Sequence, residues 1–276
     1  MIRLLALLVL AFVAIAPAHA QFNLNLNRLL DAAKNVGRAS TEIDEKQEIE
    51  IGREIASTLL GAAPLVQNDA MQRYVNQVGR WLALQSERPD LPWQFGVLDA
   101  PQVNAFAAPG GFVFITRGLL ERMKNEAELA GVLAHEIVHV LRKHHLKAIQ
   151  KNAQANLAAD ALSAAMRDTN SAVRQKLVGF GTEMFARGLD KSDELEADRL
   201  GIVIAARGGY DAYGLPSVLQ MLQAMNPEDS GLALMFKTHP APAERLGAVE
   251  TLQPVLDAYS AQPQLEERFR ASTGRR

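Results

Sequence analysis

The chain has 276 residues, of which 48% are apolar and 22% are charged, and its formal net charge is -2. This near-neutral globular composition, with 6% aromatic residues, excludes disordered and collagen-like chains and argues against a nucleic-acid partner. The absence of cysteine from the sequence excludes disulfides, thiol catalysis, cysteine-bound metals and an acylated lipoprotein cysteine.

Residues 1–20 are typical of a secretory signal peptide. Arg3 precedes an uncharged apolar run over residues 4–16, and Ala18-His19-Ala20 forms an A-x-A cleavage site. The apolar run is shorter than the roughly 20 residues that a membrane-spanning helix needs. We therefore expect cleavage after Ala20, a periplasmic location, and a mature chain with neither a transmembrane span nor a lipid anchor.

The rest of the chain is expected to form a polar N-terminal arm over residues 21–42 and a single domain over residues 43–276, since no linker-like run interrupts it. Apolar residues spaced by three and four predict helices, and alternation or a short apolar run bounded by glycines predicts strands. In chain order we expect helices after Ser40-Thr41-Glu42 and from Asp69, strands over 93–97 and 112–116, a central helix from Asn125, an Ala-rich helix over 153–186, and helices over 216–225 and 243–258. The expected fold class is therefore α+β, mainly helical with a small β-sheet.

The pentapeptide from His135 to His139 fits the pattern H-E-x-x-H and lies within the expected central helix. Residues four apart on a helix project only about 40° apart, so both imidazoles reach one metal ion. Glu136 projects about 100° from His135, where it can accept a proton from water at the open metal position. Zinc is the expected metal, because two imidazoles and a carboxylate leave its fourth position for water.

One candidate for a third ligand is His145, which has the spacing of H-E-x-x-H-x-x-G-x-x-H. The glycine position of that pattern is Arg142, so we expect the helix to continue and His145 to project about 240° away from His139. His144 and His145 are then interpreted as a polar helix end, near the last backbone carbonyls.

The other candidate is an acidic cluster on a second helix, over residues 193–199. Glu194 would bind the metal, and Asp198, four residues later, would accept the outer ring N–H of a ligand histidine. Glu196 projects about 200° from Glu194, so the two cannot bind together. Taken alone, such a cluster is equally typical of a solvated first helical turn; the H-E-x-x-H pattern makes the ligand interpretation the favoured one.

Six stretches of the chain together resemble one family: residues 48–60, 74–84, 103–120, 126–139, 192–201 and 238–246. The chain resembles the HtpX, CAAX prenyl protease and BepA-like family of gluzincin metallopeptidases, most closely its secreted bacterial branch. The resemblance implies a zincin-like metalloprotease domain with an H-E-x-x-H active-site helix and one zinc ion per chain. The family's H-E-x-x-H and E-x-x-x-D residues match His135, Glu136, His139, Glu194 and Asp198. Residues 247–276 are too few for the C-terminal helical-repeat domain of BepA-type relatives, which we expect to be lacking.

The resemblance also implies roles for Asn104, Ala105 and Phe106, which match the family's substrate-binding edge strand. Such a strand would pair with an extended peptide, whereas composition alone favours a turn before the Gly-Gly pair. Arg245 is a candidate catalytic residue that would support the site or the oxyanion; the alternative is a simple pairing with Glu244 or a helix end.

The function expected from these features is a zinc endopeptidase of the bacterial envelope, with Glu136 as base. The resemblance implies unfolded or misassembled envelope proteins as substrates, and a peripheral association with the outer-membrane assembly machinery. One alternative is a chaperone or scaffold that holds client proteins with latent proteolysis. A prenyl-protein or lipid-acting protease is disfavoured by the lack of predicted membrane helices.

His239 lies in a loop stiffened by Pro240 and Pro242. Three interpretations remain open: an inhibitory ligand at the fourth zinc position, a hydrogen-bond donor to the oxyanion, and a plain signal before the helix at Ala243. The resemblance favours the first, in which His239 gates the site.

Overall fold

The computed structural model describes residues 43–149, 151, 188–226, 231–232, 235, 238–239 and 241–274. The expected signal peptide, N-terminal arm and Ala-rich helix lie outside these residues. The helices are α2 (Glu45–Ala62), α3 (Asp69–Ala83), α4 (Arg117–Leu120), α5 (Glu126–Leu141), α8 (Lys191–Arg207), α9 (Gly214–Gln223), α11 (Pro242–Glu250), α12 (Gln253–Tyr259) and α13 (Glu266–Thr273), and the strands are β1 (Gln94–Leu98), β2 (Ala105–Ala108) and β3 (Phe112–Thr116). Within these residues no helix is both long and apolar enough to span a bilayer.

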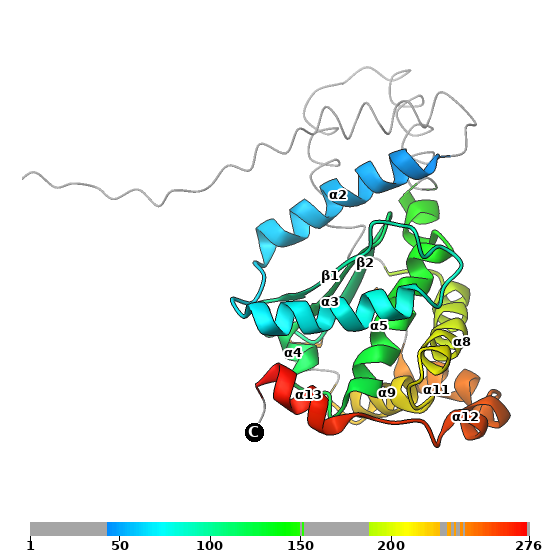
Figure 1. Ribbon diagram of the computed structural model, residues 1–276. Coiled ribbons are helices and arrows are strands. Elements are labelled where there is room, and N and C mark those ends of the chain that lie inside the picture. Colours follow the sequence, from blue (N-terminus) through cyan, green and yellow to red (C-terminus); the bar gives the residue numbers. More distant parts are fainter. Residues whose placement is uncertain are drawn as a thin grey trace, which may run out of the picture.

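The three strands form one sheet in the order β1-β3-β2. β3 pairs in parallel with β1 and antiparallel with β2. Gly110 and Gly111 connect β2 to β3 with φ angles of 76° and 101°, which a residue with a Cβ rarely adopts. The expected strands over 93–97 and 112–116 match β1 and β3, and β2 lies at the edge of the sheet, between α2 and the rest of the domain (Figure 1).

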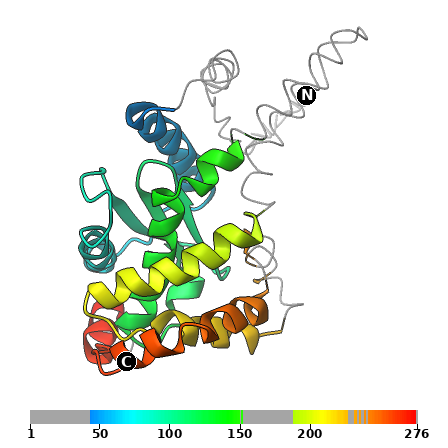
Figure 2. The same ribbon diagram turned by 90° about the vertical axis from the view of Figure 1, so that its right-hand side faces the viewer.

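Helix α5 is the centre of the molecule, and α3, α8, α9 and the sheet pack around it (Figures 1 and 2). It begins where expected, because the Asn125 side chain accepts the Glu128 N–H at 2.9 Å. Leu129, Leu133 and Ile137 are fully buried along it. Polar side chains on such a helix need partners inside the protein, since water does not reach them.

Several boundaries differ from the sequence-based expectation, and two of the differences have a clear local cause. Helix α2 starts directly after Asp44, which forms a capping box with Gln47. The helix expected over 243–258 is two helices, α11 and α12. Pro254 explains the break, because it lacks an N–H and its ring clashes with the carbonyl four residues earlier, at Glu250.

Candidate metal centre

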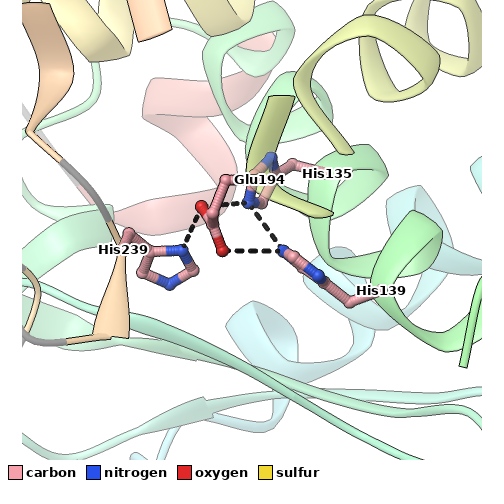
Figure 3. Close-up of side chains that lie close together, drawn as sticks. All are labelled: His135, His139, Glu194 and His239. Atoms are coloured by element: carbon pink, nitrogen blue, oxygen red, sulfur yellow. Dashed lines mark hydrogen bonds and ion pairs between the residues drawn. The ribbon is translucent and has the colours of Figure 1, made fainter. Parts of the chain in front are cut away.

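Four buried side chains from three parts of the chain meet beside the sheet: His135, His139, Glu194 and His239. One ligating atom from each lies within 4.8 Å of the other three (Figure 3). The Nε2 atoms of His135 and His139 are 3.0 Å apart, and the Glu194 carboxylate lies 3.7 Å and 3.5 Å from them. His239 Nδ1 is 2.8 Å from Glu194 Oε2.

The close approach of α8 to α5 produces this convergence. A Cβ on Gly201 of α8 would lie 2.9 Å from the backbone nitrogen of His135, so only glycine allows the two helices to pack here. Asp198 and Glu194, which lie about one and two turns before Gly201 on α8, are thereby brought to the two histidines of α5. On α5 itself, the four-residue spacing places His135 and His139 on one face of the helix, as the sequence predicts.

The unpaired oxygens of the site fit a bound cation. Among the described residues, Glu136 Oε2 and Glu194 Oε1 are buried and have no hydrogen-bond partner. A buried carboxylate oxygen without a partner is costly, and a metal ion would satisfy it. Two imidazole nitrogens and a carboxylate are the donor set of a catalytic zinc site, so the residues present fit zinc.

Asp198 and Arg245 lie on the Nδ1 side of the His135 ring, away from the Nε2 atom that faces the other ligands. Asp198 Oδ1 is 2.9 Å from His135 Nδ1, and Arg245 donates to both oxygens of Asp198, at 2.8 Å and 2.5 Å. Burial alone would raise the pKa of Asp198, but the Arg245 guanidinium lowers it well below its ordinary value. The alternative partner of Arg245, Glu244, instead contacts Lys191 at 2.8 Å.

The electrostatics of the two glutamates differ. Burial raises the pKa of Glu136 above its ordinary value. Burial also opposes ionisation of Glu194, yet His239, His135 and Arg245 together lower the pKa of its carboxyl to about 2. Glu194 is therefore the anionic member of the group, and Glu136 is a carboxyl close to cationic and imidazole side chains, with one buried oxygen that has no hydrogen-bond partner among the described residues.

Strand β2 borders the same site. Ala105 and Phe106 line a cavity together with Glu136, His145 and His239. Asn104, which precedes β2, is fully buried. Its backbone N–H donates to Thr116 Oγ1 at 3.0 Å, and its carbonyl accepts from the Thr116 amide at 3.0 Å.

The expectation that α5 continues past Arg142 is wrong. The helix ends at Leu141, and Lys143 adopts a left-handed φ of 55°, although it is not glycine. Residues 144–149 then form a new helical segment. His145 does not belong to the four-residue group, but its ring centroid lies 5.4 Å from that of His139.

The interpretation of His144 as a polar helix end is also wrong. Its side chain is 1% exposed, and its Nδ1 lies 3.0 Å from Nδ1 of His139. On its other side, His144 Nε2 is 3.3 Å from Glu196 Oε2. The only sequence signal for this residue is the pair of histidines that follows H-E-x-x-H, and spacing on an unbroken helix misplaces it.

Comparison with known proteins identifies the same region. The profile described as Peptidase family M48 matches residues 69–253. The chain is 30% identical over 247 residues to the beta-barrel assembly-enhancing protease of Escherichia coli O157:H7, covering 84% of this chain and 48% of that protein. It is 31% identical over 183 residues to the mitochondrial metalloendopeptidase OMA1 of Schizosaccharomyces pombe, covering 66% of this chain and 52% of that protein. The chain thus spans about half the length of the curated relatives it matches.

Proposed function

Because the chain belongs to peptidase family M48, we propose that it is a zinc-dependent endopeptidase whose ligands are His135, His139 and Glu194. The observation that carries the proposal is the buried convergence of these side chains within 4.8 Å, with Glu136 and Glu194 each leaving one oxygen without a hydrogen-bond partner among the described residues. Zinc bound there would polarise a peptide carbonyl and make a coordinated water acidic.

Glu136 is the proposed acid–base residue. It follows the ligand His135 directly on α5, and its side chain lines the cavity next to β2. Its free Oε2 can accept the proton of the attacking water and afterwards deliver it to the leaving amine. The apolar residues around α5 exclude bulk water. The proton that Glu136 accepts is therefore passed between groups inside the site and is not lost to solvent.

Asp198 and Arg245 are proposed to hold His135 in the reactive arrangement. The 2.9 Å contact lets the His135 Nδ1–H donate to Asp198, which leaves the Nε2 lone pair for the metal. The two hydrogen bonds from Arg245 fix the Asp198 carboxylate.

The substrate is proposed to bind as an extended peptide along β2. Since the backbone of Asn104 pairs with Thr116, the alternation of an antiparallel ladder directs the backbone groups of Ala105 and Ala107 to the outer edge. The Ala105 N–H already donates to Asn104 Oδ1 at 3.0 Å, so the Ala105 carbonyl and the backbone of Ala107 would form the main-chain hydrogen bonds to a substrate, while the Phe106 side chain lines the cavity.

His239 is proposed to gate the site. Its Nδ1 contacts Glu194, and its side chain belongs to the metal-binding group in this conformation. His239 is 8% exposed and Ala107 is fully buried, so both the catalytic group and the strand edge are closed to a peptide here. This arrangement supports the inhibitory-ligand interpretation over the oxyanion donor.

The physiological substrates are inferred to be unfolded or misassembled proteins of the bacterial envelope. This inference rests on the relatives named beta-barrel assembly-enhancing protease and on the expected export to the periplasm after removal of residues 1–20. A peripheral association with the outer-membrane assembly machinery is part of the same inference.

The direct test is to measure zinc content and casein cleavage on the same purified protein. We expect about one zinc per chain and cleavage that stops when a chelator removes the metal. A zinc-containing protein that suppresses aggregation of a client without cleaving casein would instead support the chaperone alternative.

A further inference from the structure

His144 is a buried side chain outside the ligand set that contacts one of the ligands. Its Nδ1 lies 3.0 Å from His139 Nδ1, on the side of the His139 ring opposite the metal group. We propose that His144 is a positioning residue for the metal ligand His139, backed in turn by Glu196 and Asp193. This inference rests on the proposed zinc site.

The direction of each hydrogen bond follows from the fact that a neutral imidazole has one N–H donor and one acceptor nitrogen. A His139 that offers Nε2 to the metal carries its proton on Nδ1. Nδ1 of His144 must then accept that N–H, so the His144 proton is on Nε2. Nε2 of His144 faces two carboxylates, 3.3 Å from Glu196 and 3.6 Å from Asp193, which can accept it. Each donor in the row from His139 outward thus meets an acceptor.

The break in the chain after α5 places His144 in this position. On an unbroken helix, residue 144 would project about 140° away from residue 139. The left-handed turn at Lys143 instead brings the chain back toward His139. The Lys143 ammonium lies 3.4 Å from the carboxylate of Glu48, which is fully buried and supports the turn from α2. A strained non-glycine turn that is held in this way is typical of functional sites.

The two ligand histidines then have different support. A carboxylate, Asp198, contacts Nδ1 of His135, and a neutral imidazole contacts Nδ1 of His139. Partners of the outer nitrogen fix ring orientation, and their loss typically weakens metal binding about 10–100-fold. We therefore expect His144 to contribute to zinc affinity even though it does not touch the metal.

The test compares zinc affinity, measured by chelator competition, in His144→Ala, His144→Asn and Leu146→Ala. The Asn side chain carries its oxygen at the δ1 position, where it can accept the same N–H. Leu146 is 2% exposed on the same helical segment, so its truncation weakens packing without removing a contact to His139. The cobalt-substituted proteins supply a second readout, since their visible spectra report the geometry of the ligands.

We expect His144→Ala to weaken zinc binding about 10–100-fold and to change the cobalt spectrum, and His144→Asn to restore most of both. Leu146→Ala should lower the melting temperature and leave zinc affinity unchanged. Equal zinc affinity in wild type and His144→Ala would overturn the positioning role, as would an equal loss in Leu146→Ala. A wild-type protein that binds no zinc would overturn the proposed function as well, so the two failures are distinguishable.

Discussion

The two ends of helix α5 each bury a glutamate, and the surroundings of the two carboxylates are opposite. Glu126, in the first turn, accepts hydrogen bonds from Tyr74 at 2.9 Å, from Tyr210 at 2.8 Å and from the Arg268 guanidinium. Glu136, three turns later, has a buried oxygen without a hydrogen-bond partner among the described residues.

The difference separates a structural carboxylate, Glu126, from the one that we propose to be reactive, Glu136. Glu126 is fully satisfied and lies at the positive end of the helix dipole, which favours its charge. It also ties helix α13 to the start of α5 through Arg268 (Figure 1). A satisfied carboxylate stabilises the fold, whereas an unsatisfied one destabilises it and persists where catalysis uses it.

The largest expected effect is on the metal group. His135→Ala and Glu194→Ala should lose zinc and all casein cleavage, because each removes a ligand. Glu196→Ala should keep about one zinc per chain, because Glu196 does not belong to the buried group and Asp193 remains as a partner of His144. Metal analysis of the three purified variants checks this prediction. Zinc loss in Glu196→Ala with retention in Glu194→Ala would overturn the ligand assignment.

Removal of zinc from the wild type should lower stability as well as activity. A ligand at a thousand times its dissociation constant adds about 4 kcal/mol to the free energy of unfolding. Thermal denaturation with and without a chelator measures the change. An unchanged melting temperature would contradict the proposed buried metal centre.

At the other end of α5, Glu126→Gln should destabilise the protein by about 3 kcal/mol, because the amide cannot accept from all three partners. Cleavage per folded, zinc-containing molecule should stay close to wild type, since Glu126 is remote from the metal group. Urea denaturation gives the first quantity, and cleavage normalised to zinc content gives the second. A large loss of normalised cleavage would show that the two ends are not independent.

The tyrosines around Glu126 predict a loss of stability at alkaline pH. Burial, reinforced by Glu126, raises the pKa of Tyr74 and of Tyr210 above the ordinary value. Both therefore stay neutral in the folded protein while they ionise in the unfolded chain, so the stability they contribute is full below about pH 10 and falls above it, by up to about 1.4 kcal/mol per pH unit for each tyrosine. Urea denaturation at about pH 9 and about pH 11 should show this fall, and a variant with both tyrosines changed to Phe should show a smaller one.

The smallest expected effect concerns His239. If it gates the site, His239→Ala should raise basal cleavage and self-cleavage several-fold, because apparent activity is reduced by the fraction of closed molecules. If it stabilises the oxyanion, the same change should lower turnover by up to about 10²–10³-fold. Casein cleavage by the zinc-containing variant separates the two, and a clear fall would refute the gating role.

Local sequence patterns predict the metal-ligand pair on α5 but not the partners of Glu126. The spacing of His135 and His139 depends only on helical periodicity, and Glu194 with Asp198 is recognisable by the same rule. The partners of Glu126 lie 52, 84 and 142 residues away in sequence, so no local pattern brings them together.

The errors in the sequence-based expectations have a local cause in each case. The contact between His144 and His139 depends on a left-handed turn at Lys143, a conformation that sequence rules assign to glycine. The break between α11 and α12 follows from Pro254. The sequence-based expectation of one helix over 243–258 followed the spacing of the apolar residues and gave this proline too little weight. Strand β1 was predictable from its alternating apolar residues, and β3 from a short apolar run bounded by Gly110-Gly111 and Gly118.

The most direct test of the difference between the two glutamates is to measure cleavage and stability in Glu136→Gln beside Glu126→Gln. The account predicts that zinc-containing Glu136→Gln loses about 10²–10⁴-fold or more of its casein cleavage while its free energy of unfolding stays equal or rises. Glu126→Gln should show the reverse, with lower stability and normal cleavage per folded molecule. Near-wild-type cleavage by zinc-containing Glu136→Gln would contradict the account.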